Sequence, residues 1–307
     1  MTGRYLGVDL GSTTAKAVVA DAGGTILGAG TVQMGAGSQR GMQRAVDAAL
    51  AEAGVAAEGL AGTVATGYGR RLVPGVARTF TEITCHARGT AAMCPGVRLV
   101  IDIGGQDSKA ITVDEDGLVE DFAMNDRCAS GTGRFYEVLA RALECELDEL
   151  PALALRGSRD LEVSSMCATF AETEIVSLLA QGLPAADIAS SVHRAIAART
   201  LALVAQVGKR TPVVLTGGVA RNRAAVRFLA DALDLEVQVP ARPQITGAYG
   251  AALLAVESAG RAPDQADADM SVPLFPGPPG SDRSCTDCDG TTASVVELGP
   301  AIAVRPA

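Results

Sequence analysis

The sequence has no tryptophan, only 3% aromatic residues, two histidines and no dense basic run. With 26 Lys and Arg against 35 Asp and Glu, the net charge is −9, so we expect no nucleic-acid or anionic-membrane surface. No stretch of about 18 apolar residues lacks a charge or a breaker, which argues against a transmembrane helix. The N-terminus also lacks the pattern of a secretory signal. We therefore expect a cytoplasmic protein.

The composition favours a folded protein with an aliphatic core. The chain has 307 residues, of which 48% are hydrophobic, so it can bury a sizeable core of Ala, Val, Leu and Ile. At about 150 residues per domain, this length predicts two domains. The seven cysteines are odd in number and irregularly spaced, which favours reduced thiols with metal or redox roles over disulfides.

A repeat is the strongest internal feature of the sequence. Residues 6–21 read LGVDLGSTTAKAVVAD and residues 99–114 read LVIDIGGQDSKAITVD, at an offset of 93 residues. Six of the sixteen aligned positions are identical, and most others exchange similar residues. Each copy predicts a buried strand, an Asp near its end, a small-residue turn and a second strand. The repeat therefore predicts two β-hairpins of the same design.

The turns of these hairpins have the composition of phosphate-binding loops. Small residues let backbone N–H groups approach an anion, and hydroxyl groups add donors. Asp9 and Asp102, at the strand ends, are candidates to hold a hydrated Mg²⁺, and Lys16 and Lys109 follow the turns at equal distances. The alternative is a pair of ordinary hairpins with polar tips. The turn residues are Gly11, Ser12, Thr13, Thr14, Gly104, Gly105, Gln106 and Asp107.

A third glycine-rich site follows a short apolar run at residues 213–216. Gly217 and Gly218 come after this predicted strand and before an Ala-rich helical pattern, which suits a nucleoside at a helix N-terminus. Gln244 lies just before a final small-residue helix over residues 248–259. Alone this pattern is weak evidence, and it gains weight from its place after the two hairpins.

Two cysteines, Cys128 and Cys167, each precede a predicted helix. Apolar spacing predicts both helices, with Ser130 as the N-cap of the first and a capping box of Thr169 and Glu172 in the second. A thiolate is favoured at the positive end of a helix dipole and suits a metal or a cluster. Four ligands are usual, so a twofold dimer that supplies the pair twice is the simplest completion. The alternative is two buried or merely reactive thiols.

Two further cysteine motifs have weaker interpretations. Cys85 and His86, with Glu82, form a nucleophile pair, half a metal site or a structural contact, and the structural role is favoured. Beyond residue 260 the chain turns to Pro, Gly, Asp and Ser, which is typical of a linker. Cys285 and Cys288 in this tail are half a metal or redox site, or simply two free thiols.

Two phosphate hairpins followed by a Gly-Gly site resemble the acetate and sugar kinase, Hsc70 and actin superfamily. The implied fold is α/β, with two ribonuclease-H-like lobes and ATP in the cleft between them. The residues themselves support the duplicated hairpin and alternating strands and helices. We expect an N-terminal lobe over residues 1–95, a C-terminal lobe over residues 96–260 and a flexible Pro/Gly-rich tail over residues 261–307.

Longer motifs narrow the resemblance to one family. IDIGGQDSKAI begins at residue 101, MNDRCASGTGRF at residue 124 and CATFAE at residue 167. They resemble activators of 2-hydroxyacyl-CoA dehydratases, which group with the ATP-binding subunits of benzoyl-CoA reductases in the BadF/BadG/BcrA/BcrD ATPase family. The resemblance runs from about residue 4 to residue 260. It is specific, because sugar kinases and chaperones do not share the two cysteine contexts.

This resemblance implies a homodimer with one [4Fe–4S] cluster at its interface. Cys128 and Cys167 match the cluster ligands, and each subunit binds ATP or ADP with Mg²⁺. A reduced ferredoxin or flavodoxin supplies the electron. ATP hydrolysis is coupled to passing one low-potential electron to an iron–sulfur dehydratase or reductase component, in an anaerobic, oxygen-sensitive system.

The resemblance also implies roles around the nucleotide. Ser12, Thr13 and Lys16 hold the β- and γ-phosphates, and Asp9 and Asp102 hold the hydrated Mg²⁺. Either Gln106 or Asp107 orients the attacking water, as polar residues do in other NTPases. Gly217, Gly218 and Gln244 lie around the adenosine.

Gly131, Thr132 and Gly133 begin the helix after Cys128, close in sequence to the second hairpin. If they also touch the nucleotide, the phosphate state can move that helix and strain the cluster.

Other functions compete with this one. A sugar or acyl kinase of the same superfamily needs a carboxylate base in the cleft and no cysteine pair. A regulatory ATPase would hold structural zinc in the pair. A third alternative is an electron donor to another low-potential iron–sulfur reductase, because the sequence identifies neither partner nor acyl-CoA substrate.

Overall fold

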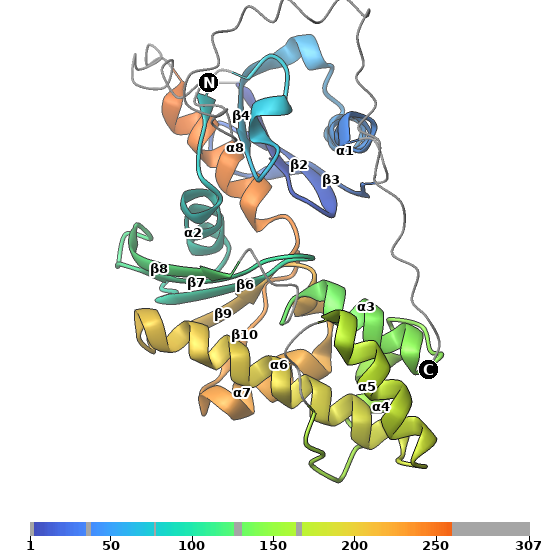
Figure 1. Ribbon diagram of the computed structural model, residues 1–307. Helices are drawn as coiled ribbons and strands as arrows, with labels where there is room; N and C mark the ends of the chain where they lie inside the picture. Colours follow the sequence, from blue (N-terminus) through green and yellow to red (C-terminus); the bar gives the residue numbers. More distant parts are fainter. Residues whose placement is uncertain (1–2, 35–37, 77, 126–130, 164–167, 260–307) are drawn as a thin grey trace, which may run out of the picture. The chain divides into compact units, whose positions relative to one another are not determined.

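The computed structural model describes residues 3–34, 38–76, 78–125, 131–163 and 168–259 (Figure 1). Residues 1–263 form one compact unit, which contains two five-stranded sheets. Each sheet contains one copy of the sequence repeat as a β-hairpin. The expected tail, with Cys285 and Cys288, lies outside the described residues.

The first sheet has the strand order β3-β2-β1-β4-β5, antiparallel on the β3 side and parallel on the β5 side. Along β2, Ala17 and Val19 pack with the cluster around α1 (Ser38–Ala53), while Val18 and Ala20 pack against α8 (Thr246–Ser258). This period-2 alternation explains why the repeat is apolar on both faces. The strands are β1 (Arg4–Leu10), β2 (Thr14–Asp21), β3 (Ile26–Gln33), β4 (Leu60–Thr66) and β5 (Arg78–Thr79).

The second sheet repeats this plan in the order β10-β9-β6-β7-β8. Leu99 and Ile101 share a core cluster with α6 (Ala185–Val207), while Val100 packs with residues of α2 (Glu82–Met93) on the opposite face. The strands are β6 (Leu99–Ile103), β7 (Ser108–Val113), β8 (Val119–Asn125), β9 (Val213–Thr216) and β10 (Val237–Gln238).

The helices predicted after Cys128 and Cys167 are present as α3 and α5, with two corrections to their caps. The predicted N-cap Ser130 is wrong, since α3 begins at Gly133 with Thr132 as its N-cap. Thr169 lies inside α5, which begins at Ala168, so it is not a cap either. Among the described residues, no helix is long and apolar enough to cross a membrane. The remaining helices are η1 (Ala57–Gly59), η2 (Arg70–Leu72), α3 (Gly133–Ala142), α4 (Leu150–Ala154), α5 (Ala168–Ala180), η3 (Val219–Arg221) and α7 (Arg223–Leu233).

Two glycines bring α2 and α8 into backbone contact. A Cβ atom at Gly89 would collide with the carbonyl oxygen of Thr246, and one at Gly250 would collide with the carbonyl oxygen of Cys85. Because α8 covers the first sheet and α2 covers the second, this crossing links the elements of the two sheets.

Candidate functional site

The two repeated hairpins place an Asp and a Lys at equivalent positions. Asp9 of β1 pairs in register with Lys16 of β2, and Asp102 of β6 pairs with Lys109 of β7. Paired residues of an antiparallel ladder project from the same face, so each lysine lies beside its aspartate. The sequence predicted this duplication. The two lysines nevertheless have different surroundings in the structure.

In the first hairpin, Lys16 Nζ lies 3.1 Å from Asp9 Oδ2. Burial alone would lower the pKa of Lys16, and the carboxylates of Asp9, Asp102 and Asp107 outweigh that effect and raise it. Gly67, whose φ is +92°, packs tightly against the end of β1, because a Cβ there would lie 2.6 Å from Asp9 Oδ1. Lys16 keeps 17% of its side chain exposed. A cation and a carboxylate are therefore both available beside the first turn.

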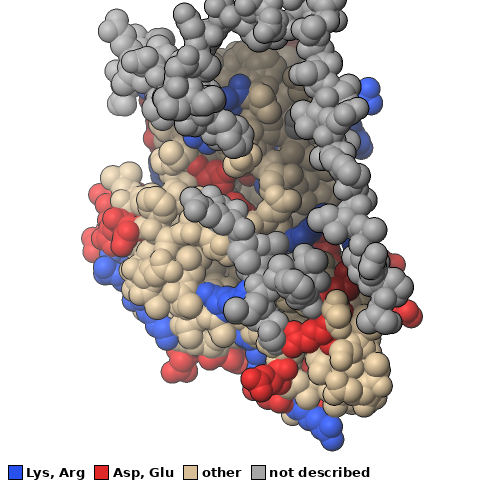
Figure 2. Space-filling view, viewed as in Figure 1, with Lys and Arg blue, Asp and Glu red and all other residues tan. Residues whose placement is uncertain are grey.

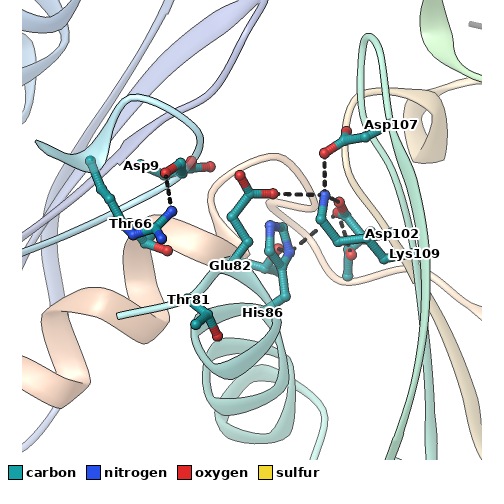
Figure 3. A network of polar contacts seen from close by, with 12 residues as sticks. Asp9, Thr66, Thr81, Glu82, His86, Asp102, Asp107 and Lys109 are labelled. Atoms are coloured by element: carbon teal, nitrogen blue, oxygen red, sulfur yellow. Dashed lines mark hydrogen bonds and ion pairs between the residues drawn. The ribbon is translucent and has the colours of Figure 1, made fainter. Parts of the chain in front are cut away.

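In the second hairpin, Lys109 is enclosed by three carboxylates (Figure 3). Its Nζ lies 3.0 Å from Glu82, 3.4 Å from Asp102 and 2.5 Å from Asp107. Burial would lower the pKa of Lys109, but Asp102, Asp107 and Glu82 raise it overall. Only 2% of the side chain is exposed, so this charge acts within the site.

Asp102 is the centre of a buried polar network. Its Oδ1 accepts a 2.8 Å hydrogen bond from Thr216 Oγ1 and lies 3.3 Å from His86 Nδ1. Burial by itself raises the pKa of this carboxyl, but His86, Lys109 and Thr216 bring the pKa down to about 2. His86 Nδ1 also lies 3.2 Å from the hydroxyl of Thr246 in α8. The network joins β6, α2, β9 and α8 (Figure 3).

The two turns approach each other closely. A Cβ atom at Gly105 would collide with the Thr13 side chain. Each turn is closed by one backbone hydrogen bond, from the Gly11 N–H to the Thr14 carbonyl (3.2 Å) and from the Gly104 N–H to the Asp107 carbonyl (2.9 Å). Ser12 in the first turn and Gln106 in the second are exposed. On the face seen in Figure 2, acidic and basic side chains are scattered among other residues, and an acidic group lies in a hollow above the middle of the view.

The start of α3 is hydrogen-bonded directly to the second turn. Thr132 Oγ1 donates to the carbonyl of Gly105 at 3.0 Å. The backbone N–H groups of Gly133 and Arg134 donate to the carbonyls of Gly104 and Gly105, at 2.8 and 2.9 Å. These bonds explain the later start of α3, because the turn satisfies amide groups that a side-chain cap would otherwise satisfy.

The Gly-Gly site lies against the same aspartate. A Cβ at Gly217, whose φ is +86°, would lie 3.0 Å from Asp102 Oδ1. A Cβ at Gly218 would lie 3.8 Å from Gln244 Nε2. Beside them is a pocket of about 350 Å³, whose lining includes residues of β3 and of the segment before α8. It is lined by Ala29, Thr31, Arg221, Ala241, Arg242, Pro243, Gln244 and Ile245.

Cys128 and Cys167 lie outside the described residues. Within the described part of the chain, no group of three or more His, Cys, Asp and Glu has an arrangement that could hold a metal ion. Burial raises the pKa of the Cys85 thiol to about 12, which opposes a nucleophilic role for Cys85. His86 instead contacts Asp102 and Thr246, which agrees with the structural role favoured from the sequence.

The sequence did not predict that Glu82 and His86 contact Lys109 and Asp102. Glu82 and His86 are four residues apart on α2, and residues at that spacing share one face of a helix. Thr81 caps α2 and accepts a 3.3 Å hydrogen bond from Thr84 N, which fixes Glu82 as the first helical residue. The i, i+4 spacing of an acid and a histidine was the available signal.

Comparisons with known proteins give a family and several relatives. A sequence model of the BadF/BadG/BcrA/BcrD ATPase family matches residues 6–255. The activator of lactoyl-CoA dehydratase from Anaerotignum propionicum is 46% identical over 254 residues, which are 83% of this chain and 98% of that protein. One of the subunits of the benzoyl-CoA reductase of Thauera aromatica is 35% identical, over 69% of this chain and 77% of that protein.

Solved structures give the same result. Component A of the (R)-2-hydroxyglutaryl-CoA dehydratase of Acidaminococcus fermentans has a TM-score of 0.80 at 39% identity, covering 84% of this chain and 99% of that one. The activator of the 2-hydroxyisocaproyl-CoA dehydratase of Clostridium difficile, with bound ADPNP, has a TM-score of 0.79 at 36% identity, covering 89% and 100%. A glucokinase of Streptomyces griseus, at 18% identity and a TM-score of 0.51, covers 83% and 100% and shows the fold alone. The expected superfamily fold is confirmed.

Proposed function

The chain belongs to the BadF/BadG/BcrA/BcrD ATPase family, as its motifs predicted, and we propose that it is an ATP-dependent one-electron activator. Its partner is a 2-hydroxyacyl-CoA dehydratase or a benzoyl-CoA-type reductase, because relatives of both kinds match it. The donor is a reduced ferredoxin or flavodoxin. The working form is a homodimer that shares one [4Fe–4S] cluster.

ATP binds across the two turns and the Gly-Gly site. Ser12, Thr13 and the backbone of Gly11 and Thr14 surround the β- and γ-phosphates, with Lys16 as the cation, and Gly104 and Gly105 approach from the second turn. The adenosine occupies the pocket beside Gly217, Gly218 and Gln244. The ADPNP-bound relative supports this use of the fold.

The site also suits a hydrated Mg²⁺. Asp9 and Asp102 are buried carboxylates, oxygen ligands that Mg²⁺ accepts directly or through water. The ion pair of Asp9 with Lys16 uses Oδ2, whereas both oxygens of Asp102 already have protein partners. Asp9 is therefore the principal residue that would hold the ion, and Asp102 supports it. The bound ion would neutralise phosphate charge.

Hydrolysis needs a residue that orients water. Asp107 is paired with Lys109, so its carboxylate is engaged, while Gln106 is exposed in the same turn. Gln106 is accordingly the water-orienting residue, and Asp107 fixes Lys109 in place.

One observation carries the proposal: the phosphate turn and α3 are hydrogen-bonded to each other through Gly104 and Gly105. Cys128 stands five residues before α3 begins, so a change at the phosphates reaches the helix next to that cysteine. A simple kinase needs no such link. Two-state elements of this kind turn a nucleotide change into a mechanical one.

The donor set fits an iron–sulfur cluster shared by two chains. Cys167 directly precedes α5, and α5 packs against α3, so both cysteines lead into neighbouring helices. Thiolates are the ligands of such clusters, and two per chain give four in a twofold dimer. When bound, the cluster would carry the transferred electron.

Anaerobic purification tests the proposal. We expect about four iron and four sulfide per dimer, the usual content of a [4Fe–4S] centre, and a dimeric native mass. Reduction by dithionite should give an electron paramagnetic resonance signal that changes with ATP. A colourless zinc or metal-free protein that still binds ATP would refute electron transfer and favour a kinase or regulatory ATPase.

A further inference from the structure

The buried histidine His193, on α6, has one consistent pattern of hydrogen bonds. Its Nδ1 lies 2.7 Å from the carbonyl of Ala189, which can only accept, so Nδ1 carries the proton. Its Nε2 then accepts from Asn222 Nδ2 at 3.0 Å. Asn222 Oδ1 accepts from the backbone N–H groups of Ala224 and Ala225, at 2.9 and 3.0 Å. Every proton position follows from these partners.

This histidine touches elements from two parts of the site. Asn222 is the N-cap of α7 and ends the segment of residues 217–222, which we name the nucleoside turn. On the other side, the His193 ring packs on Tyr136 of α3, with centroids 4.8 Å apart and the ring planes tilted by 54°. Phe228 of α7 packs on the same ring at 5.7 Å. A single side chain thus joins α6, α7 and the helix that follows Cys128.

The imidazole is held in its neutral form. It is fully buried, and burial lowers the pKa of His193 to about 4 although its hydrogen bonds to Ala189 and Asn222 act in the opposite direction. The nearby guanidinium of Arg194 stacks on Phe228, 5.3 Å from the ring centroid. At neutral pH Nε2 therefore keeps its lone pair and can hold Asn222 in one orientation.

We propose that His193 is a positioning residue that holds the nucleoside turn in a fixed position relative to α3. It does so by accepting the Asn222 hydrogen bond while its ring packs on Tyr136. A change at the nucleoside would then reach α3 by a route separate from the Thr132 and Gly105 contact. This inference rests on the proposed function, which puts a nucleoside beside Gly217 and Gly218.

Matched variants separate the hydrogen bond from the packing. His193→Phe keeps a ring between Tyr136 and Phe228 but removes the acceptor, whereas His193→Gln keeps an acceptor and removes the ring. Thr200→Val is the control, because it deletes a buried hydrogen bond of the same helix, to the Ile196 carbonyl at 3.1 Å, away from the nucleoside turn.

The measurement is hydrogen exchange of α3 in the full-length dimer, with ADP against ADPNP. We expect the nucleotide-dependent difference in α3 exchange to fall about fivefold or more in His193→Phe, a typical loss of coupling between sites. Thr200→Val should keep the wild-type difference, whereas His193→Gln should also lose much of it, because it removes the ring that packs on Tyr136. A global loss of stability would move all helices alike and would not change the α3 difference selectively.

A wild-type difference in His193→Phe would overturn the inference, and so would a wild-type protein whose α3 does not respond to nucleotide. If His193→Phe does not fold, Asn222→Ser tests the same bond, because serine still caps α7 but cannot reach His193. The exchange measurement needs no electron transfer. Failure of the proposed function would appear as a missing cluster in the wild type, whereas failure of this inference appears in the exchange of α3.

Discussion

The hydroxyl of Thr132, at the N-cap of α3, donates a 3.0 Å hydrogen bond to the carbonyl of Gly105, in the turn between β6 and β7. The residues are 27 positions apart, and a phosphate-binding turn and a helix terminus meet there. The proposed coupling between ATP and the cluster depends on this junction.

Replacing this hydroxyl tests the junction. Thr132→Val should lower the free energy of unfolding by about 1 kcal/mol, the usual net value of such a bond. Thr112→Val is the control. It removes a comparable hydrogen bond of 3.3 Å, from Thr112 in β7 to the carbonyl of Asp121 in β8, away from the turn. Both should be destabilised similarly in urea titrations followed by circular dichroism. Only Thr132→Val should weaken the ATP-dependent change of the cluster signal, and equal responses would contradict the coupling.

The two repeated lysines should differ in what they stabilise. Lys109→Met leaves Glu82, Asp102 and Asp107 without their shared cation, so we expect roughly 3–5 kcal/mol of destabilisation, as for other broken buried pairs. Lys16→Met should cost less, because one partly exposed pair is lost.

Nucleotide affinity gives a second test of the role of Lys16. Lys16→Met should weaken ATP binding about tenfold or more, as expected when a phosphate loses a charge-assisted contact worth about 1.5–3 kcal/mol, while iron content stays unchanged. Calorimetric titration with ADPNP measures the affinity. An unchanged affinity would place the phosphates elsewhere.

Stability should fall with acid because of His193. Its pKa is lowered from 6.5 to about 4 in the folded protein, so the unfolded chain binds a proton that the folded state excludes. The stability contribution is complete above pH 6.5 and decreases by roughly 3 kcal/mol as the pH falls to about 4. Urea titrations across this range check it. His193→Phe should show a smaller decrease and Thr200→Val the wild-type decrease; identical slopes would reject this origin.

Single substitutions test the two proposed cluster ligands. Cys128→Ala and Cys167→Ala should each abolish the four-iron cluster, because a twofold site loses two of its four thiolates at once. ADPNP binding should remain close to wild type, since the turns and the Gly-Gly site are intact. Iron and sulfide analysis beside calorimetry measures both. A four-iron cluster that persists in either variant would refute the assignment.

The repeat predicted the hairpins closely, because strand, turn and strand are local patterns. The predicted segment at residues 6–21 contains β1 and β2 apart from Arg4 and Tyr5, and the segment at residues 99–114 contains β6 and β7. The different surroundings of Lys16 and Lys109 were not predictable in the same way. Glu82 approaches Lys109 from α2, and that contact depends on tertiary packing.

The start of α3 was likewise not predictable from the local sequence. Ser130 had the right chemistry for an N-cap, but the amide groups of Gly133 and Arg134 are satisfied by carbonyls from residues almost thirty positions earlier. The contacts of His193 also leave no local signal, because its partners Asn222 and Tyr136 lie far away in the sequence. Long-range partners of this kind leave no periodic pattern to recognise.

Two of the three bonds between the second turn and α3 join main-chain atoms, from Gly133 to Gly104 and from Arg134 to Gly105. Such bonds use no side-chain atoms, but a Cβ at Gly133 would lie 3.0 Å from the Gly104 carbonyl oxygen, so the junction is tightly packed. Proline at position 133 would remove one donor, and the first position of a helix is where proline is tolerated. An imino acid there would therefore remove one of the three bonds and leave the helix itself intact.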